Sequence, residues 1–338
     1  MNKTLLIGPR EFKKSPGKTG GIVVLFEDLI SQCDKLGISY IVIDSNKENY
    51  PNKLFSYFAI LFYFLKNIPN VTSVSLHGTA NDYIFIAPVI IFFSKLVGKK
   101  TSLRKFAGNF NTIYDNSSFV VKKLINYILK KSDTVFFETK YLVKKFEKYN
   151  SNTYWFPNVR KRTNIKTDEI YRKRFVFVGQ IKEEKGIREI LEVSNLLDSS
   201  YKIDLYGNIF DNMKDTNFSK YNAKYKGFIK STEVLQVLSE YDVLLLPTFW
   251  EGEGYPGVII EAMSVGLPVI ASNMQGISEM LKEDMSILID AKNIMQLKSS
   301  IESFNEKEYN DMSKNAFSLF DDYDSEIQSK LFLSRINI

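Results

Sequence analysis

The sequence predicts an α/β protein built from two doubly wound parallel sheets. Short apolar runs alternate with helical patterns along the chain, and this alternation is typical of parallel strands joined by crossover helices. A polar stretch at 161–173 divides the apolar runs into two series. With 338 residues, the chain is long enough for two domains of ordinary size.

The first series of apolar runs lies before the polar stretch. It predicts strands at Lys3–Ile7, Ser39–Ile43, Thr72–Leu76, Thr101–Lys105, Thr134–Phe137 and Thr153–Phe156. Helical patterns at Ile22–Leu36 and Phe119–Lys130 fit between these strands. We therefore expect a first domain at 1–163.

The second series follows the polar stretch. It predicts strands at Arg174–Val178, Tyr201–Tyr206, Ala223–Lys226, Val243–Pro247, Pro268–Ala271 and Ser286–Ile289. Helical patterns lie between them at Ile187–Leu197, Ser231–Ser239 and Val258–Val265. We expect a second domain at 164–319, followed by a helical tail. Ligands of open α/β sheets bind beyond the carboxyl ends of the strands, so two such domains would face each other across a cleft.

Composition indicates a soluble globular protein, with 44% hydrophobic and 25% charged residues. The only cysteine, Cys33, excludes an intrachain disulfide and a cysteine-based zinc cluster, and a reducing cytoplasm is the simpler expectation. Two apolar stretches, Leu54–Ile68 and Tyr83–Val97, are shorter than the roughly 18 residues that a membrane-spanning helix needs. We expect both to form buried helices.

Charge is distributed unevenly along the chain. Residues 1–165 hold 25 Lys and Arg against 11 Asp and Glu, whereas residues 166–338 hold 20 against 28. The basic half could face an anionic lipid surface, a pyrophosphate-linked acceptor or nucleic acid, or it could be an ordinary solvated surface. No nucleic-acid-binding motif accompanies the charge, so we expect no nucleic acid partner.

The stretch EGYPGVIIEAMSVGLPVIAS at 253–272 carries the most chemical information. It places Glu253 and Glu261 eight positions apart, around a turn that leads into a small-residue helix and an apolar strand. A helix N-terminus offers free N–H groups to an anion such as phosphate. Carboxylates beside it can accept hydrogen bonds from neutral hydroxyls. Phosphate and hydroxyls held in one site describe a nucleotide-sugar.

This stretch resembles the donor-site signature of the retaining GT-B glycosyltransferases of the glycosyltransferase 4 group, in which two glutamates are separated by seven residues. The resemblance extends through YDVLLLPTFWEGEGYPG at 241–257, GISEML at 276–281 and FVGQIKEEKGIREIL at 177–191 and its flanking strand. It implies two Rossmann-like domains facing across a cleft, with a C-terminal helix at about 320–338 that packs back on the first domain. It also implies transfer from a nucleoside-diphosphate sugar.

The resemblance assigns roles to the residues of this stretch. Glu261 would hydrogen-bond the donor ribose, and Glu253 would meet the transferred sugar and stabilise an oxocarbenium-like transition state. The backbone N–H groups of Gly257 and Val258 would hold the diphosphate. Gly254 and Tyr255 would shape the loop around the sugar.

Other donor-binding residues are implied outside this stretch. Lys185 matches a lysine that clamps the diphosphate in similar proteins, whereas Gln180 stands where they have an arginine, so Lys182 or a basic residue of the first domain could substitute for it. Gly20 and Gly21 match paired glycines that approach the phosphate. Ile229 matches the position that holds the base through backbone groups.

The acceptor side is less well defined by the sequence. His77, the only histidine, ends the strand VTSVSLHG at the predicted edge of the cleft. Similar proteins often have a second histidine on the next strand, but that strand here reads SLRKFAGNF, with Arg104 and Lys105. His77 and Arg104 are both candidates for an active-site role, and these residues leave the choice between them open.

We therefore expect a metal-independent, retaining hexosyltransferase with no cofactor. No Asp-x-Asp motif follows an expected strand, and cations with helix N–H groups would do a metal's work. The expected acceptor is a glycan or lipid-linked glycan in surface polysaccharide assembly, at the inner face of an anionic cytoplasmic membrane. Two alternatives stay open: a nucleotide-sugar epimerase of the same architecture, and a non-catalytic nucleotide-sugar-binding subunit.

Overall fold

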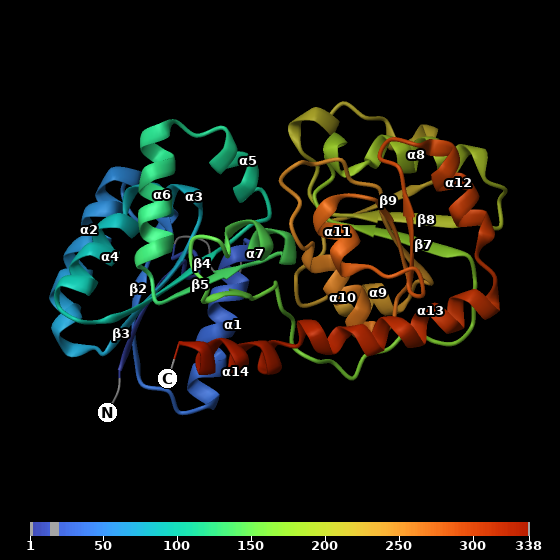
Figure 1. Cartoon of the computed structure of the whole chain (residues 1–338). Coiled ribbons are helices and arrows are strands. Elements are labelled where there is room, and N and C mark those ends of the chain that lie inside the picture. The colour runs from blue at the N-terminus through green and yellow to red at the C-terminus, as the bar shows by residue number, and fades with distance from the viewer. Residues whose placement is uncertain (1–2, 14–19, 337–338) are drawn as a thin grey trace. The chain divides into compact units, whose positions relative to one another are not determined.

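The computed structural model describes residues 3–13 and 20–336, which divide into two compact units. The first unit comprises residues 1–159 and 325–338, and the second comprises residues 160–324. Each unit contains one six-stranded sheet in which all strands run parallel (Figure 1). The α/β class with two parallel sheets, predicted from the alternation of strands and helices, is therefore confirmed.

The sheet of the first unit has the strand order β2-β1-β3-β4-β5-β6. Its strands are β1 (Thr4–Gly8), β2 (Tyr40–Asp44), β3 (Ser73–Gly78), β4 (Lys100–Lys105), β5 (Thr134–Phe137) and β6 (Thr153–Trp155). The order changes direction between β1 and β3, which is where doubly wound sheets bind ligands beyond the strand ends.

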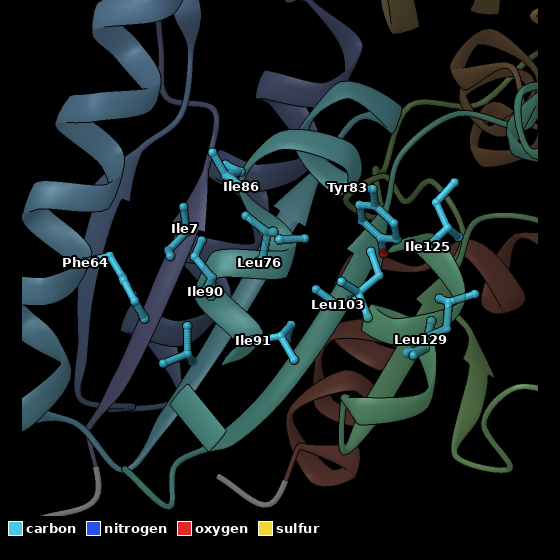
Figure 2. Packing of buried hydrophobic residues seen from close by; sticks show 14 of the residues in the cluster. Ile7, Phe64, Leu76, Tyr83, Ile86, Ile90, Ile91, Leu103, Ile125 and Leu129 are labelled. Carbon is cyan, nitrogen blue, oxygen red and sulfur yellow. The ribbon is translucent and has the colours of Figure 1, made fainter. Parts of the chain in front are cut away.

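One face of this sheet is covered by a layer of helices that share a single hydrophobic core. The layer contains α2 (Lys53–Asn67), α3 (Ala80–Phe85), α4 (Ala87–Leu96), α5 (Phe110–Asp115), α6 (Phe119–Lys131) and α7 (Lys140–Phe146). Figure 2 shows Phe64 of α2, Ile90 of α4 and Ile125 of α6 in this core, together with side chains of β1, β3 and β4.

The opposite face is covered by the two ends of the chain. Helices α1 (Gly21–Lys35) and α14 (Ser325–Arg335) pack against each other, and Phe26 and Phe332 belong to the second core of the unit. The Gln32 amide donates to the Ser325 hydroxyl at 2.8 Å. The C-terminal helix is thus an integral layer of the first unit.

The expectation that Leu54–Ile68 and Tyr83–Val97 form buried helices is only half right. Both stretches are helical. However, α2 buries one stripe and leaves its other side exposed, and the large apolar side chains at the end of α4 are exposed as well. A helix on the outside of a sheet can bury only the stripe that faces the sheet. In the described parts of the chain, no helix is long and apolar enough to cross a membrane.

The sheet of the second unit has the strand order β12-β11-β10-β7-β8-β9. Its strands are β7 (Arg174–Val178), β8 (Lys202–Tyr206), β9 (Lys224–Gly227), β10 (Val243–Leu246), β11 (Val269–Ser272) and β12 (Ser286–Ile289). The switch in this order lies between β7 and β10, so the loops that follow these two strands lie next to each other.

The helices of the second unit pack in two groups: α8 with α12, and α10 with α9 and α13. Their bounds are α8 (Ile187–Leu196), α9 (Val234–Ser239), α10 (Gly257–Val265), α11 (Gln275–Met280), α12 (Ile294–Ser303) and α13 (Glu306–Leu319). Short 3₁₀ turns occur at η1 (Lys47–Asn49), η2 (Ile68–Asn70), η3 (Glu183–Lys185), η4 (Asp211–Met213), η5 (Phe218–Lys220) and η6 (Phe320–Tyr323).

Candidate functional site

The loops that follow β7 and β10 meet at the switch point of the second sheet. The Glu184 carbonyl accepts from the Phe249 N–H at 2.8 Å and from the Thr248 hydroxyl at 3.1 Å. Gly186 has φ +75°, and a Cβ there would lie 2.2 Å from the Pro247 carbonyl oxygen. Only glycine allows this approach, so the sequence KEEKG brings Lys185 to the loop that carries Glu253.

Lys185 and Glu253 form an ion pair in which both side chains are nearly closed to solvent. The Thr248 hydroxyl donates to the same Glu253 carboxylate at 3.2 Å. Burial lowers the pKa of the Lys185 ammonium, Glu253 opposes this shift, and the nearby charge of Lys182 adds to it. The structure therefore brings together two residues that the sequence assigned to separate motifs.

Trp250 joins a second cation to this pair. The Lys185 ammonium lies 4.6 Å from the centre of the indole ring, and the Lys182 ammonium lies 4.0 Å from it. A ring face attracts cations through its quadrupole, so one indole holds both lysines beside Glu253. This contact places a second cation close to Gln180, which stands where similar proteins have an arginine. Gln180 is exposed and uncharged, and it lies two residues before Lys182.

Glu261 pairs with an arginine that the sequence analysis did not single out. The Arg160 Nε donates to the Glu261 carboxylate at 2.6 Å, and both side chains are about one-fifth exposed. A Cβ at Gly257 would lie 1.9 Å from one Arg160 guanidinium nitrogen. The glycine at the first position of α10 therefore makes room for this cation beside the N-terminus of the helix.

The N-terminus of α10 has the features of an anion site. Gly257 and Val258 are its first two residues, no side chain of the described residues caps it, and its first turn contains no acid. The helix macrodipole places partial positive charge there. Arg160 adds a full positive charge, and Glu261 lies one turn further along the helix, at its fifth residue.

The loop before α10 is fixed from the other side by α11. The Tyr255 hydroxyl donates to the Glu279 carboxylate at 2.8 Å, and Tyr255 is only 1% exposed. A Cβ at Gly276 would lie 2.3 Å from the Gly254 carbonyl oxygen, so the two segments touch through their backbones. Tyr255 thus has a structural partner, and the shape of the loop around Glu253 is set by these contacts.

The remaining donor candidates lie apart from these pairs. Ile229 is half-buried, two residues beyond the end of β9. Gly20 caps α1 and Gly21 begins it; a Cβ would meet nothing within 4 Å at either position, and Gly20 has an ordinary φ of −98°. The fold itself therefore does not require glycine at 20 or 21. A role for these three residues in donor binding stays a prediction.

The two acceptor-side candidates are both buried in the first unit. The His77 ring is fully buried, and its centroid lies 5.1 Å from that of Phe26 and 5.4 Å from that of Phe332. Its Nε2 shares a hydrogen bond of 2.9 Å with the Ser75 hydroxyl. Burial lowers the pKa of His77 well below its ordinary value, and the charge of Arg104 adds to this shift.

Arg104 is 1% exposed, and its guanidinium lies 3.8 Å from the centre of the Phe156 ring. It donates to the Pro157 carbonyl at 3.3 Å. Burial also lowers the pKa of the adjacent Lys105 to about 8, a shift that the Glu138 carboxylate opposes. His77 lies near the end of β3, as the sequence predicts, but aromatic side chains of α1 and α14 cover its ring.

Sequence reasoning missed Arg160, Thr248 and Trp250 as parts of the site. Arg160 follows the motif PNV, and nothing in its local pattern indicates a partner 101 positions away. Trp250 lies within the matched stretch, but its role depends on two lysines from another loop. No group of three His, Cys, Asp or Glu that could hold a metal occurs among the described residues.

The fold is shared with solved structures of other proteins. The chain superposes over its full length on the structure of HepE from Anabaena in complex with UDP, with a TM-score of 0.75 and 13% identity, covering 100% of both chains. The two parallel six-stranded sheets are those of the GT-B glycosyltransferases.

The sequence match is more specific and lies in the second unit. Residues 157–318 match the family described as Glycosyl transferases group 1. An uncharacterized 41.2 kDa protein in the cps region of Klebsiella pneumoniae is 31% identical over 141 residues, which are 39% of this chain and 38% of that protein.

A second relative carries a name that describes a reaction. It is the UDP-Gal:alpha-D-GlcNAc-diphosphoundecaprenol alpha-1,3-galactosyltransferase of Escherichia coli, 29% identical over 157 residues, which are 43% of this chain and 40% of that protein. The chain thus spans about two-fifths of the length of these two curated relatives.

Proposed function

We propose that this protein transfers a sugar from a nucleoside-diphosphate sugar to a hydroxyl of a glycan or lipid-linked glycan, in the synthesis of a surface polysaccharide. The observation that carries the proposal is the pairing of Glu253 with Lys185 and of Glu261 with Arg160, beside the uncapped N-terminus of α10. The family match over this stretch and the name of the Escherichia coli relative support it.

The diphosphate of the donor would bind at the N-terminus of α10. The N–H groups of Gly257 and Val258 point along the helix axis toward this position, as they do in other helix N-termini that bind anions. Lys185 would neutralise the charge that builds on the departing nucleotide. Lys182, held on the same indole ring, would supply the second cation in place of the uncharged Gln180.

Glu261 would accept hydrogen bonds from the ribose hydroxyls. A carboxylate that is held by a cation stays ionised and oriented, and its remaining lone pairs are available to neutral donors. Arg160 would therefore act as a positioning residue for Glu261. Its guanidinium beside Gly257 would also contribute positive charge near the diphosphate. With these cations present, we propose that the reaction needs no metal ion.

Glu253 would face the transferred sugar. The diphosphate is a stronger anionic partner for Lys185 than a single carboxylate, so donor binding would draw the lysine from Glu253. The freed carboxylate could then stabilise the positive charge of an oxocarbenium-like transition state. The acceptor oxygen would bond to the anomeric carbon on the face where the bond to the leaving phosphate breaks. Its proton would pass to that phosphate, and the anomeric configuration would be retained.

His77 and Arg104 are not assigned to substrate contact in this proposal. Both are buried at the ends of β3 and β4, and their partners are aromatic rings, the Ser75 hydroxyl and the Pro157 carbonyl. They would act by holding those strand ends in place. The cytoplasmic location expected from the sequence stays a prediction.

Glu253→Ala tests this proposal against a matched control, Glu251→Ala. Both glutamates lie in one loop, but Glu251 is exposed and Glu253 holds Lys185. We expect Glu253→Ala to lower turnover of a UDP- or GDP-sugar by about a hundredfold or more, and Glu251→Ala to leave it within about twofold. UDP, which lacks the sugar, should still raise the thermal midpoint of both variants.

The assay follows the release of nucleoside diphosphate and the transfer of labelled sugar to a lipid-linked acceptor. Near-normal turnover of the Glu253→Ala variant would contradict the assignment. Conversion of the donor to its epimer without an acceptor would instead indicate an epimerase. Binding of the donor without any turnover would indicate a non-catalytic subunit.

A further inference from the structure

Helix α2 presents an apolar stripe to solvent. Ser56, Ile60 and Phe64 face the sheet and are buried. Opposite them lies a second stripe of large apolar side chains, here called the α2 outer stripe: Leu54, Phe55, Phe58, Phe62 and Leu65. The exposed fractions of Leu54, Phe58 and Phe62 are 66%, 65% and 64%. A helix that is apolar on all sides is normally buried, so this stripe indicates an unfilled contact.

The apolar surface extends beyond α2. The ring of Phe85, from α3, lies 5.6 Å from that of Tyr57 of α2 and is also mostly exposed. Phe92 and Leu96 continue along α4 as exposed side chains. A shallow groove runs along α2 and is lined by Tyr50, Phe55, Phe58, Ala59, Phe62 and Tyr63. Scattered apolar residues are ordinary on protein surfaces, whereas a cluster of exposed aromatic side chains along one helix marks an interaction site.

The charge of the same helical layer indicates which kind of partner can bind to it. Helices α2, α4, α6 and α7 all pack on one face of the first sheet and contain no acidic residue. Together they carry ten lysines: Lys53, Lys66, Lys95, Lys122, Lys123, Lys130, Lys131, Lys140, Lys144 and Lys145. Two of them form ion pairs, Lys95 with Asp133 and Lys145 with Asp115. A second copy of the chain would still bring an excess of lysines against an excess of lysines, so self-association through this layer is disfavoured by like charge.

We propose that this helical layer docks on a bilayer that is rich in anionic lipids, with the α2 outer stripe inserted at the boundary between headgroups and acyl chains. Aromatic and leucine side chains flanked by lysines are the composition of helices that lie in the plane of a membrane surface. The lysines of the layer are attracted to the phosphates of the headgroups. This docking is independent of the proposed transfer reaction and would hold if the chain had another activity.

The first experiment measures sedimentation of the full chain with vesicles. One set contains phosphatidylglycerol and phosphatidylcholine, and the other contains phosphatidylcholine alone, at about 0.1 M salt, where charges are screened beyond about 10 Å. We expect binding to the anionic vesicles that weakens as salt rises, and about tenfold or more weaker binding to the neutral ones. Equal binding to both sets, or no binding to either, would overturn the proposal.

The second experiment replaces the stripe. Phe58→Ser with Phe62→Ser should weaken binding to the anionic vesicles by about tenfold or more, because each exposed ring contributes buried apolar area. The matched control is Leu196→Ser with Phe228→Ser, two exposed apolar residues of the second unit, which should bind as the unaltered chain does. If both double variants bind equally, the stripe is not the docking surface.

Two further readouts distinguish membrane docking from nucleotide binding and from self-association. Thermal stabilisation by UDP should be the same in the stripe variant and in the unaltered chain, so a failure of the proposed nucleotide site would be recognised separately. Light scattering reports the oligomeric state. A dimer that the stripe variant abolishes would overturn the membrane proposal and show that the stripe binds a second copy.

Discussion

The contribution of the ion pair between Lys185 and Glu253 to the free energy of unfolding can be measured separately from its contribution to donor binding. Only 12% of the Lys185 side chain and 7% of the Glu253 side chain are exposed. Removing one member of a buried pair costs about 3–5 kcal/mol, because the other charge is left in a poor environment. The Thr248 hydroxyl still donates to Glu253, so we expect Lys185→Met to lower the free energy of unfolding by about 2 kcal/mol.

The same cost of about 2 kcal/mol is expected for Glu253→Gln, which leaves the Lys185 ammonium buried. The double substitution removes both charges, so it should cost only about 1 kcal/mol. The coupling between the two sites would then be about 3 kcal/mol, at the upper end of values for residues in contact. If Lys185 and Glu253 contribute to donor binding, the double variant should bind UDP weakly although its fold is stable.

Urea unfolding followed by tryptophan fluorescence measures these values. The chain has two tryptophans, Trp155 in the first unit and Trp250 in the second. In a Trp155→Phe background, Trp250 is the remaining tryptophan, so the fluorescence reports the second unit alone. Trp250 also lies close to the pair, since the Lys185 ammonium is 4.6 Å from its ring. A double variant that loses the sum of both single effects, about 4 kcal/mol, would refute the coupling.

Two further predictions concern charge in each unit. Burial lowers the pKa of Lys105 from 10.5 to about 8 on folding. Between pH 8 and 9 the unfolded state therefore binds more protons, so the free energy of unfolding of the first unit should rise by up to about 1.4 kcal/mol. Urea unfolding at both pH values should show a smaller rise in Lys105→Met, and an unchanged rise would contradict this pKa. Above pH 9, the raised pKa of Cys33 offsets the contribution of Lys105. In the second unit, Arg160→Met should weaken UDP binding by about ten- to a hundredfold in calorimetry, because it removes a charged hydrogen bond to Glu261. Arg162→Met, which alters an exposed arginine, is the control, and equal loss in both variants would refute a specific role for Arg160.

The central strands of the two sheets, such as β1, β3, β10 and β11, could be predicted from the sequence because they are buried on both sides. A strand of this kind is a nearly continuous apolar run, such as VLLL at 243–246, bounded by polar or turn residues. The predicted start of that strand, at Val243, coincides with the start of β10. The expected helix at Ser231–Ser239 begins later, at Val234, because turn residues precede it.

Contacts between distant segments could not be predicted in this way. The sequence places His77 at the end of a strand, but the ring that covers it from α14 comes from Phe332, 255 positions later. Arg160 meets Glu261 across 101 positions. A periodic pattern indicates which stripe of an element is buried, and it carries no information about which remote side chain fills the remaining space.

The exposed stripe of α2 shows a second limit of the same kind. The helix is apolar around its whole circumference, and such a pattern indicates burial without naming what covers each side. The sheet covers one side through Ile60 and Phe64. The absence of acids from α2 and three neighbouring helices of the same layer is also visible in the sequence, but only the fold shows that these helices share one face.

The spacing of eight between Glu253 and Glu261 gains a physical meaning from the two ion pairs. One carboxylate precedes α10 and the other lies one turn inside it, and each carboxylate holds a cation. We propose that a diphosphate bound there competes with Glu253 for Lys185, whereas Arg160 stays paired with Glu261. Donor binding would then release Glu253 toward the sugar and leave Glu261 open to the ribose. An unliganded chain would keep both acids neutralised and the site closed to stray cations.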